Sequence, residues 1–244
     1  TFTGNDRLSD SKLLTAGLSS RLLDPDTGAE IVRLSYAQRL RLRNQLVTLP
    51  GGTPETARFS DMLFGASINW NPSWLLDTTV QYDPKLKRSN RAVIGARYSP
   101  SDYRVVSASY RLNRGASEQI DLGWQWPIND LRGDKGKEMG SGRGQGKGRW
   151  YSVGRLNFSI RDRRNVDTVL GLEYDGGSWL GRAVYERLQT TASSANARIL
   201  LQLEFVGFAR VGSNPLSTLQ SQVPRYRPLR EKIQVTPSPL STYD

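Results

Sequence analysis

The chain has 244 residues, of which 34 are basic and 23 acidic, so its formal net charge is +11. An apolar content of 37% together with 23 glycines is typical of a globular protein rather than a disordered polymer. The absence of histidine and cysteine excludes a Ser-His-Asp triad, a cysteine nucleophile and thiolate metal sites, and no apolar run is long enough for a transmembrane helix. A carboxylate pair or a Ser-Lys dyad remains possible, but no spacing indicates one. We therefore expect neither an enzyme nor a bound cofactor.

A two-residue alternation of apolar and polar side chains recurs along the chain and predicts β-strands. The clearest example places Ile120, Leu122 and Trp124 on one face and polar residues at the positions between them. About eleven strands are predicted, most of them about ten to thirteen residues long, and no convincing helix separates them. Their approximate ranges in chain order are 12–23, 30–42, 59–70, 74–82, 89–98, 106–112, 119–126, 149–161, 166–174, 178–190 and 196–208.

The length of these strands favours an all-β fold of the antiparallel transmembrane β-barrel type. Strands of soluble domains usually have about five or six residues, whereas a tilted strand that crosses a bilayer needs about nine to eleven. Tight turns such as Asn71-Pro72 alternate with longer loops at 43–58 and 128–148, as in outer-membrane barrels. Aromatic residues near strand ends suit the two membrane–water interfaces, although they would also suit the core of a soluble β-sandwich, which stays the alternative fold.

In a barrel, alternate side chains of each strand face the lipid and the aqueous lumen. Leu122 is then predicted to face lipid, and an arginine is expected to be tolerated in place of Asp121 but not in place of Leu122. The predicted lumen-facing residues are Gln119, Asp121, Gln125 and Glu173.

Two segments lack the strand pattern. Residues 132–149 are rich in glycine and basic side chains, which predicts a solvated loop; an anionic partner is the alternative, but nucleic acid is not expected because no aromatic residues are interleaved with the charges. After the last strand, residues 216–223 predict a short helix, and the prolines that follow predict an extended or disordered chain. We therefore divide the chain into barrel residues 1–211 and a periplasmic C-terminal tail, 212–244.

Six stretches of the sequence carry a family resemblance as a set, although each is weakly specific alone. They are NDRLSDSKLLTAGLSSRLLD at 5–24, VQYDP at 80–84, DLGWQWPIND at 121–130, WYSVGRLNFSIRDRR at 150–164, LGLEYDGGSW at 170–179 and LQLEFVGFARVGSNPLSTLQSQVPRYRP at 201–228. Together they resemble, in the family's order, the barrel of the lipopolysaccharide-assembly proteins. This family is also called lipopolysaccharide transport protein D, and formerly the organic solvent tolerance protein.

The resemblance implies the C-terminal part of a larger barrel of about 26 strands. It implies assembly of lipopolysaccharide into the outer leaflet of a Gram-negative cell outer membrane, with release through a lateral gate between the first and last strands. The implied partners are lipopolysaccharide, a plug lipoprotein (lipopolysaccharide transport protein E) and a periplasmic lipopolysaccharide bridge, which is reached through an N-terminal β-jellyroll domain. Composition and strand pattern alone would equally suit a diffusion porin or another outer-membrane channel.

The resemblance also assigns roles to particular residues. The closing strand would be one lip of the gate, with Arg198, Leu200, Gln202, Leu203, Glu204 and Phe205 as its residues. Family members often carry adjacent cysteines after the Glu-Tyr of one turn, and the matching positions here are Gly177 and Ser178. If the closing strand runs inward, strand parity predicts that the turn at 175–178 and the loop at 128–148 lie in the periplasm.

Overall fold

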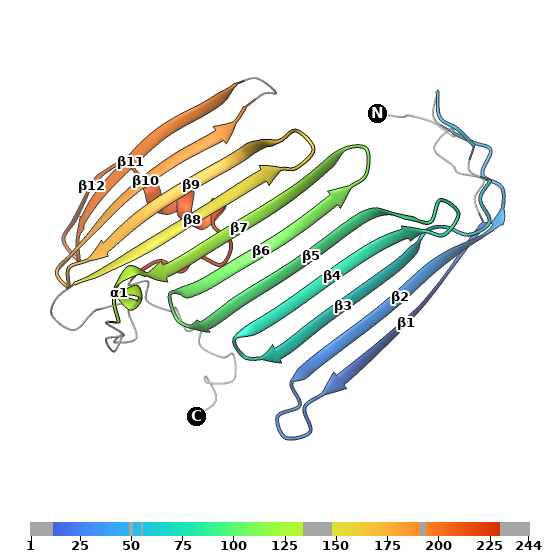
Figure 1. Ribbon diagram of the computed structural model, residues 1–244, viewed down its shortest axis with the longest axis horizontal. Coiled ribbons are helices and arrows are strands. Elements are labelled where there is room, and N and C mark those ends of the chain that lie inside the picture. The colour runs from blue at the N-terminus through green and yellow to red at the C-terminus, as the bar shows by residue number, and fades with distance from the viewer. Residues whose placement is uncertain (1–11, 49–50, 55, 134–147, 191–193, 230–244) are drawn as a thin grey trace, which may run out of the picture. The chain divides into compact units, whose positions relative to one another are not determined.

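The computed structural model describes residues 12–48, 51–54, 56–133, 148–190 and 194–229. Within these residues the protein forms one sheet of twelve strands, in which each strand pairs with its neighbours in sequence (Figure 1). The predicted all-β, antiparallel fold is confirmed, and the described sheet is not closed. Neither of the helices within the described residues has the length and apolar composition to cross a membrane.

The elements follow one another along the chain, with longer connections between β2 and β3 and between α1 and β8. The strands are β1 Lys12–Leu23, β2 Glu30–Arg43, β3 Met62–Asn71, β4 Trp74–Asp83, β5 Arg88–Ser101, β6 Arg104–Asn113, β7 Ser117–Pro127, β8 Arg149–Ser159, β9 Arg164–Asp175, β10 Trp179–Gln189, β11 Ala195–Phe205 and β12 Ala209–Gly212, and the helices are α1 Ile128–Leu131 and α2 Pro215–Gln222.

The C-terminal end of the sheet differs from the sequence prediction. The last strand was expected to reach residue 208, but β11 ends at Phe205, and Gly207 adopts a left-handed φ of 79° in the turn that follows. The Phe208 N–H donates to the Phe205 carbonyl oxygen at 3.0 Å, and the chain doubles back as β12. A four-residue strand spans about 13 Å and cannot cross a bilayer, so the eleven long strands remain the membrane-crossing candidates.

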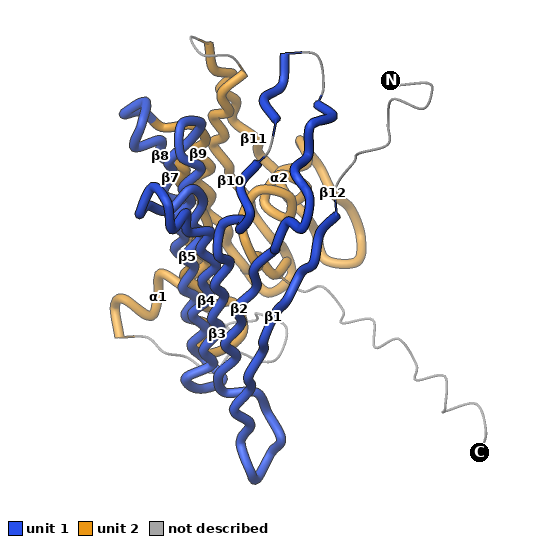
Figure 2. The backbone as a smooth tube through the Cα atoms, turned by 90° about the vertical axis from the view of Figure 1, so that its right-hand side faces the viewer, with its two compact units in different colours: residues 1–98, 108–121, 158–164 blue, residues 99–107, 122–157, 165–244 orange. Residues whose placement is uncertain are grey.

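The chain divides into two compact units, which Figure 2 colours separately. Unit 1 contains residues 1–98, 108–121 and 158–164, and unit 2 contains residues 99–107, 122–157 and 165–244. In unit 1, every residue of β1 is exposed, and Ala92 is the one buried hydrophobic residue within the described part. Unit 1 is therefore sheet with little core of its own.

Unit 2 contains an apolar core between the sheet and α2. Val153 on β8, Val169 on β9 and Val184 on β10 pack against Leu219 of α2, and all four are at most 1% exposed. Pro215 begins the helix, where its missing N–H costs nothing because the first turn has no partner for it. The helix ends before Val223, which is extended, as expected for a residue that precedes a proline.

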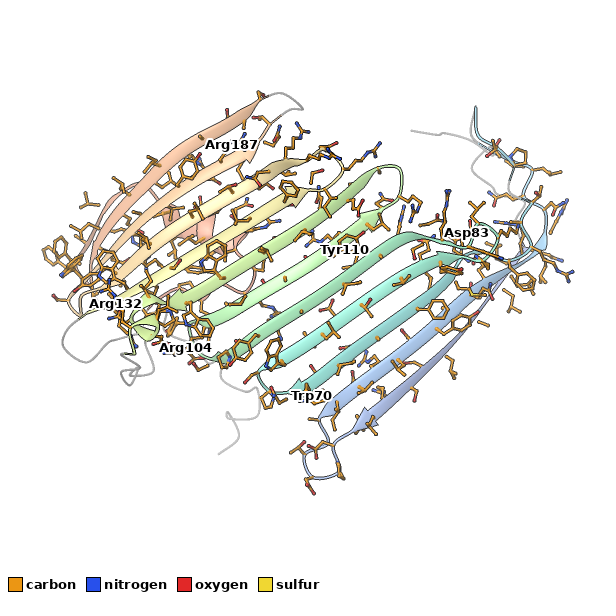
Figure 3. The ribbon with its side chains drawn as sticks, viewed as in Figure 1. Trp70, Asp83, Arg104, Tyr110, Arg132 and Arg187 are labelled. Atoms are coloured by element: carbon orange, nitrogen blue, oxygen red, sulfur yellow. The ribbon has the colours of Figure 1, made fainter. Side chains whose placement is uncertain are left out.

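Several aromatic rings pair on neighbouring strands and stay at least partly exposed. In unit 1, the ring of Trp74 lies 4.6 Å from that of Tyr98, while Trp70, labelled in Figure 3, is 81% exposed. In unit 2, Tyr174 lies 4.8 Å from Trp150 and 4.9 Å from Trp179. Such exposure argues against the soluble sandwich, in which these rings would be buried.

Candidate functional site: the covered face of unit 2

One face of the unit 2 sheet is covered by α2 and residues 223–229, and we call it the covered face. Burial alternates along β10, where Leu180, Arg182, Val184 and Glu186 are buried between more exposed residues. The covered face therefore combines an apolar centre with charged side chains, whereas the opposite face leaves Leu172 and Leu201 exposed. The period of two along each strand is the cause of this division.

Arg182 is the centre of a buried polar network on the covered face. Its guanidinium donates to Glu173 Oε1 at 2.8 Å, to Gln202 Oε1 at 3.1 Å and to Glu204 Oε2 at 2.8 Å. Arg182 faces Glu173 in the β9–β10 register and Gln202 in the β10–β11 register. The side chains of Arg182 and Glu173 are 2% and 0% exposed, so this arginine joins three strands in a site without bulk water.

The C-terminal segment is bound to the same network by side-chain hydrogen bonds. The Tyr226 hydroxyl donates to Glu173 Oε1 at 2.7 Å. The side-chain amide of Gln125 bonds both backbone groups of Arg227. Its Nε2 donates to the Arg227 carbonyl oxygen at 2.8 Å, and its Oε1 accepts from the Arg227 N–H at 2.9 Å. Burial, and then the nearby Glu173 carboxylate, raise the pKa of Tyr226 well above its usual value, which keeps the hydroxyl protonated as a donor.

Close approach of the backbone completes the docking of this segment. A Cβ on Gly123 would lie 2.8 Å from Pro224 Cδ, so the segment could not lie there above any larger residue. Leu229 is buried together with Tyr103, Tyr151 and Leu180. Residues 224–229 are thus packed against the sheet rather than extended away from it, which corrects the expectation drawn from the prolines.

The structure places three of the four predicted lumen-facing residues in buried positions. Gln125 and Glu173 are 0% exposed and contact the C-terminal segment, whereas Asp121 is 5% exposed and lies 3.9 Å from Arg111 in unit 1. Gln119 is half-buried. An aqueous lumen on this side stays a prediction, as does tolerance of an arginine at Asp121, although a cation at this buried position beside Arg111 would be unfavourable.

The predicted gate residues fall on both faces of β11. Leu200 packs against the apolar core, Gln202 and Glu204 accept hydrogen bonds from Arg182, and Arg198 forms an ion pair with Glu186. Leu203 and Phe205 lie on the opposite face and are exposed. Sequence reasoning did not predict Arg182 or Tyr226 as members of the site; the charge of Arg182 within an apolar strand was the available signal, and Tyr226 offered none.

The outer edge of β11 is only partly paired. β12 pairs with Gln202–Phe205, and no strand among the described residues lies beside residues 195–201 on that side. At the end of the paired part, Ser213 replaces a strand: its Oγ accepts from the Leu201 N–H at 2.8 Å, and its own N–H donates to the Leu201 carbonyl oxygen at 2.9 Å. The paired and unpaired parts of the edge thus meet at Leu201.

The two positions matched to the family's cysteines lie in the turn between β9 and β10. Gly177 has a left-handed φ of 86°, and its N–H donates to Asp175 Oδ1 at 3.0 Å. The carbonyl oxygen of Ser178 accepts from the Val206 N–H at 3.0 Å. This turn is therefore held to both β9 and the turn after β11. No group of three or more acidic residues that could hold a metal ion occurs within the described part of the chain.

Long antiparallel strands with side chains that alternate between two faces, one of which exposes apolar residues, define this protein as part of a β-barrel sheet. The family model of LptD, described as LPS transport system D, matches residues 1–134. The chain belongs to this family.

Relatives extend the similarity over the whole chain. It is 61% identical over 243 residues to the LPS-assembly protein LptD of Polaromonas sp. and 60% identical over 244 residues to that of Albidiferax ferrireducens. The LPS-assembly protein LptD of Thiobacillus denitrificans is 35% identical over 98% of the chain. The chain spans only 29% to 30% of the length of these relatives.

Proposed function

We propose that this chain is the C-terminal part of an outer-membrane β-barrel that assembles lipopolysaccharide into the outer leaflet of a Gram-negative cell. The proposal combines membership of the LptD family with the names of its relatives. The protein works as a translocon component rather than an enzyme, and its partners are lipopolysaccharide, a plug lipoprotein and a periplasmic lipopolysaccharide bridge that reaches the N-terminal part of the whole protein. The C-terminal tail lies on the periplasmic side, with residues 213–229 docked on the covered face.

The partly paired edge of β11 is the observation that supports a lateral gate at this strand. In lipid, an unpaired backbone N–H or carbonyl costs several kcal/mol, so a seam that opens must have few hydrogen bonds to break. β12 and Ser213 satisfy the edge from Leu201 to Phe205 without any help from another strand. Only residues 195–200 are then left to pair with the first strand of the whole barrel, and a short pairing separates at low cost.

Locking this seam should stop lipopolysaccharide export. Among the gate residues, Gln202 is buried and already lies opposite Gly212, so the exposed Ala197 is the better position for a crosslink. In the full-length protein, we expect Ala197→Cys, joined to a cysteine on the first barrel strand, to abolish delivery of lipopolysaccharide to the cell surface until a reductant is added. Surface lipopolysaccharide is measured in cells in which the crosslinked variant is the sole source of this protein.

A second disulfide provides the matched control. Ala183 and Leu201 face each other in the β10–β11 register, and the Leu201 backbone bonds to Ser213 instead of β10, so they form a close, non-hydrogen-bonded pair. A disulfide between Ala183→Cys and Leu201→Cys crosslinks strands that stay paired, and export should continue. Normal export by the Ala197 crosslink would show that this edge is not the gate, as expected of a diffusion porin.

The two faces of β7 should respond differently to charge. Leu122 is 42% exposed on the face that we assign to lipid. An arginine there should destabilise the folded protein in a bilayer by about 2–4 kcal/mol. The half-buried Gln119, on the other face, is the control, and Gln119→Arg should change the folded fraction little. Equal losses of the heat-resistant folded band on gels would contradict the assignment of faces.

A further inference from the structure

Three turns of unit 1 form a basic surface that the proposed function does not use. This basic rim consists of residues 83–91, 111–118 and 159–164, which belong to the β4–β5, β6–β7 and β8–β9 turns and the strand ends beside them. The rim contains nine of the 34 basic residues and three of the 23 acidic ones, so it holds a net +6 of the chain's +11. Asp83 of the rim is labelled in Figure 3, as is Tyr110, the residue of β6 just before the middle rim segment.

Backbone contacts hold the three turns side by side. The Arg114 N–H donates to the Asn90 carbonyl oxygen at 2.8 Å, and its Nε donates to the Ser89 carbonyl oxygen at 2.7 Å. On the other side of the middle turn, the Ile160 N–H donates to the Glu118 carbonyl oxygen at 2.9 Å. The cations of the rim are therefore carried on one connected surface rather than on separate loops.

The acidic residues of the rim neutralise only part of its positive charge, and one of them, Asp162, lies 3.9 Å from Arg164. Each of its acidic residues accepts a local hydrogen bond: Asp83 from the Lys85 N–H at 2.9 Å, Glu118 from the Tyr110 hydroxyl at 2.8 Å and Asp162 from the Ser159 hydroxyl at 3.0 Å. The basic residues, by contrast, are mostly exposed to solvent. The exposed ones are Lys85, Lys87, Arg88, Arg91, Arg111, Arg114, Arg161 and Arg163.

The opposite end of unit 1 has a different character. The β1–β2 turn contains Asp24 and Asp26 and no cation, and the β3–β4 turn lies between Trp70 and Trp74. Between the two ends, Val93 and Ile94 are exposed apolar residues of β5. From Arg88 to Tyr98, β5 extends by about 33 Å, which at a barrel tilt of roughly 40° gives a height of about 25 Å. This height equals that of the apolar band of an outer-membrane barrel, so the rim lies at one polar interface.

We propose that the basic rim binds the phosphate groups of lipid A, the phosphorylated glycolipid anchor of lipopolysaccharide, in the leaflet around this end of the strands. Guanidinium groups bind phosphate oxygens in a bidentate manner, lysines add point charges, and the acyl chains lie along the apolar band below. The proposal rests on the proposed function for its orientation: successive turns lie at alternate ends of the strands, so a periplasmic turn at 175–178 puts the rim at the outer leaflet.

The test measures binding of lipid A to the purified full-length protein in detergent. The probes are fluorescent diphosphoryl lipid A and the same lipid with its phosphates removed. Lys85→Gln, Lys87→Gln and Arg163→Gln are combined in one variant, because these exposed side chains lie at the turns and glutamine keeps most of their length. The control variant combines Arg21→Gln, Arg33→Gln and Arg97→Gln, which remove the same charge from other positions of unit 1. Heat-modifiable migration on gels verifies that both variants are folded.

The wild-type protein should bind the phosphorylated probe more tightly than the dephosphorylated one. A cation beside an anionic lipid surface contributes about a fivefold factor in affinity, so the rim variant should bind the phosphorylated probe at least about tenfold more weakly, and the control variant should match the wild type. Wild-type affinity in the rim variant, equal binding of both probes, or a preference for phosphatidylglycerol would overturn the proposal. Surface delivery of lipopolysaccharide, measured separately in cells, tests the proposed function. If that test fails, the binding assay still decides whether the basic rim binds lipid A.

Discussion

Replacing Arg182 with methionine should lower the free energy of unfolding of the full-length protein by about 3–5 kcal/mol. Methionine fills a similar volume but leaves Glu173, which is 0% exposed, as a buried carboxylate whose remaining hydrogen bond comes from Tyr226. Removal of one partner of a buried ion pair is costly, because the other charge can neither reach water nor find a new partner. Urea unfolding, followed through the fraction of heat-modifiable folded protein, measures the change.

Two comparison variants distinguish the cost of leaving a buried charge unpaired from the cost of losing any arginine. Arg33→Met removes a pair with Glu30 in which the arginine side chain is 51% exposed, and it should leave the free energy of unfolding almost unchanged. The double variant Arg182→Met with Glu173→Gln removes both charges and should recover part of the lost stability. If Arg182→Met is no more destabilising than Arg33→Met, the network does not stabilise the sheet.

The strands and their faces could be predicted from the sequence because period-two patterning is a local signal. In β7, burial alternates along Asp121, Leu122, Gly123 and Trp124, as the alternation of apolar and polar residues predicts. The eleven long strands were found by the same signal. Strand length then distinguished a membrane barrel from a soluble sandwich, since the two classes need different lengths.

The end of β11 could not be predicted from this pattern. Apolar residues continue through Val206 and Phe208, so the predicted strand runs past Phe205, but the left-handed Gly207 turns the chain back into β12. Turn geometry overrides side-chain periodicity here, because a single residue with positive φ reverses the chain. The unpaired part of the β11 edge is a consequence of this turn, and it was not visible in the sequence.

Docking of the C-terminal segment is the other feature that sequence reasoning missed. The Gln125–Arg227 contact joins residues 102 positions apart, and no periodic pattern encodes such a separation. Prolines in the tail suggested a free chain, yet Pro224 packs over Gly123, where only a glycine leaves room. Tail residues that the sequence pattern predicts to be solvated thus form part of the covered face, and their partners are polar side chains of the strands.

Replacing Leu219 with aspartate should release the C-terminal segment from the covered face. Leu219 is 0% exposed and packs against Val153, Val169 and Val184, where a carboxylate would find no water and would cost several kcal/mol. A loss of about 3 kcal/mol raises the population of the released segment roughly 100-fold, and proteolysis follows that population when opening is fast. Trypsin should therefore cleave the bond between Arg225 and the buried Tyr226 on the order of 100 times faster, as followed by mass spectrometry of the C-terminal fragment.

Gln220→Asp places the same charge on the exposed side of α2 and should leave the rate unchanged. Equal cleavage of the two variants would mean that the segment is not held by its apolar contact with the sheet.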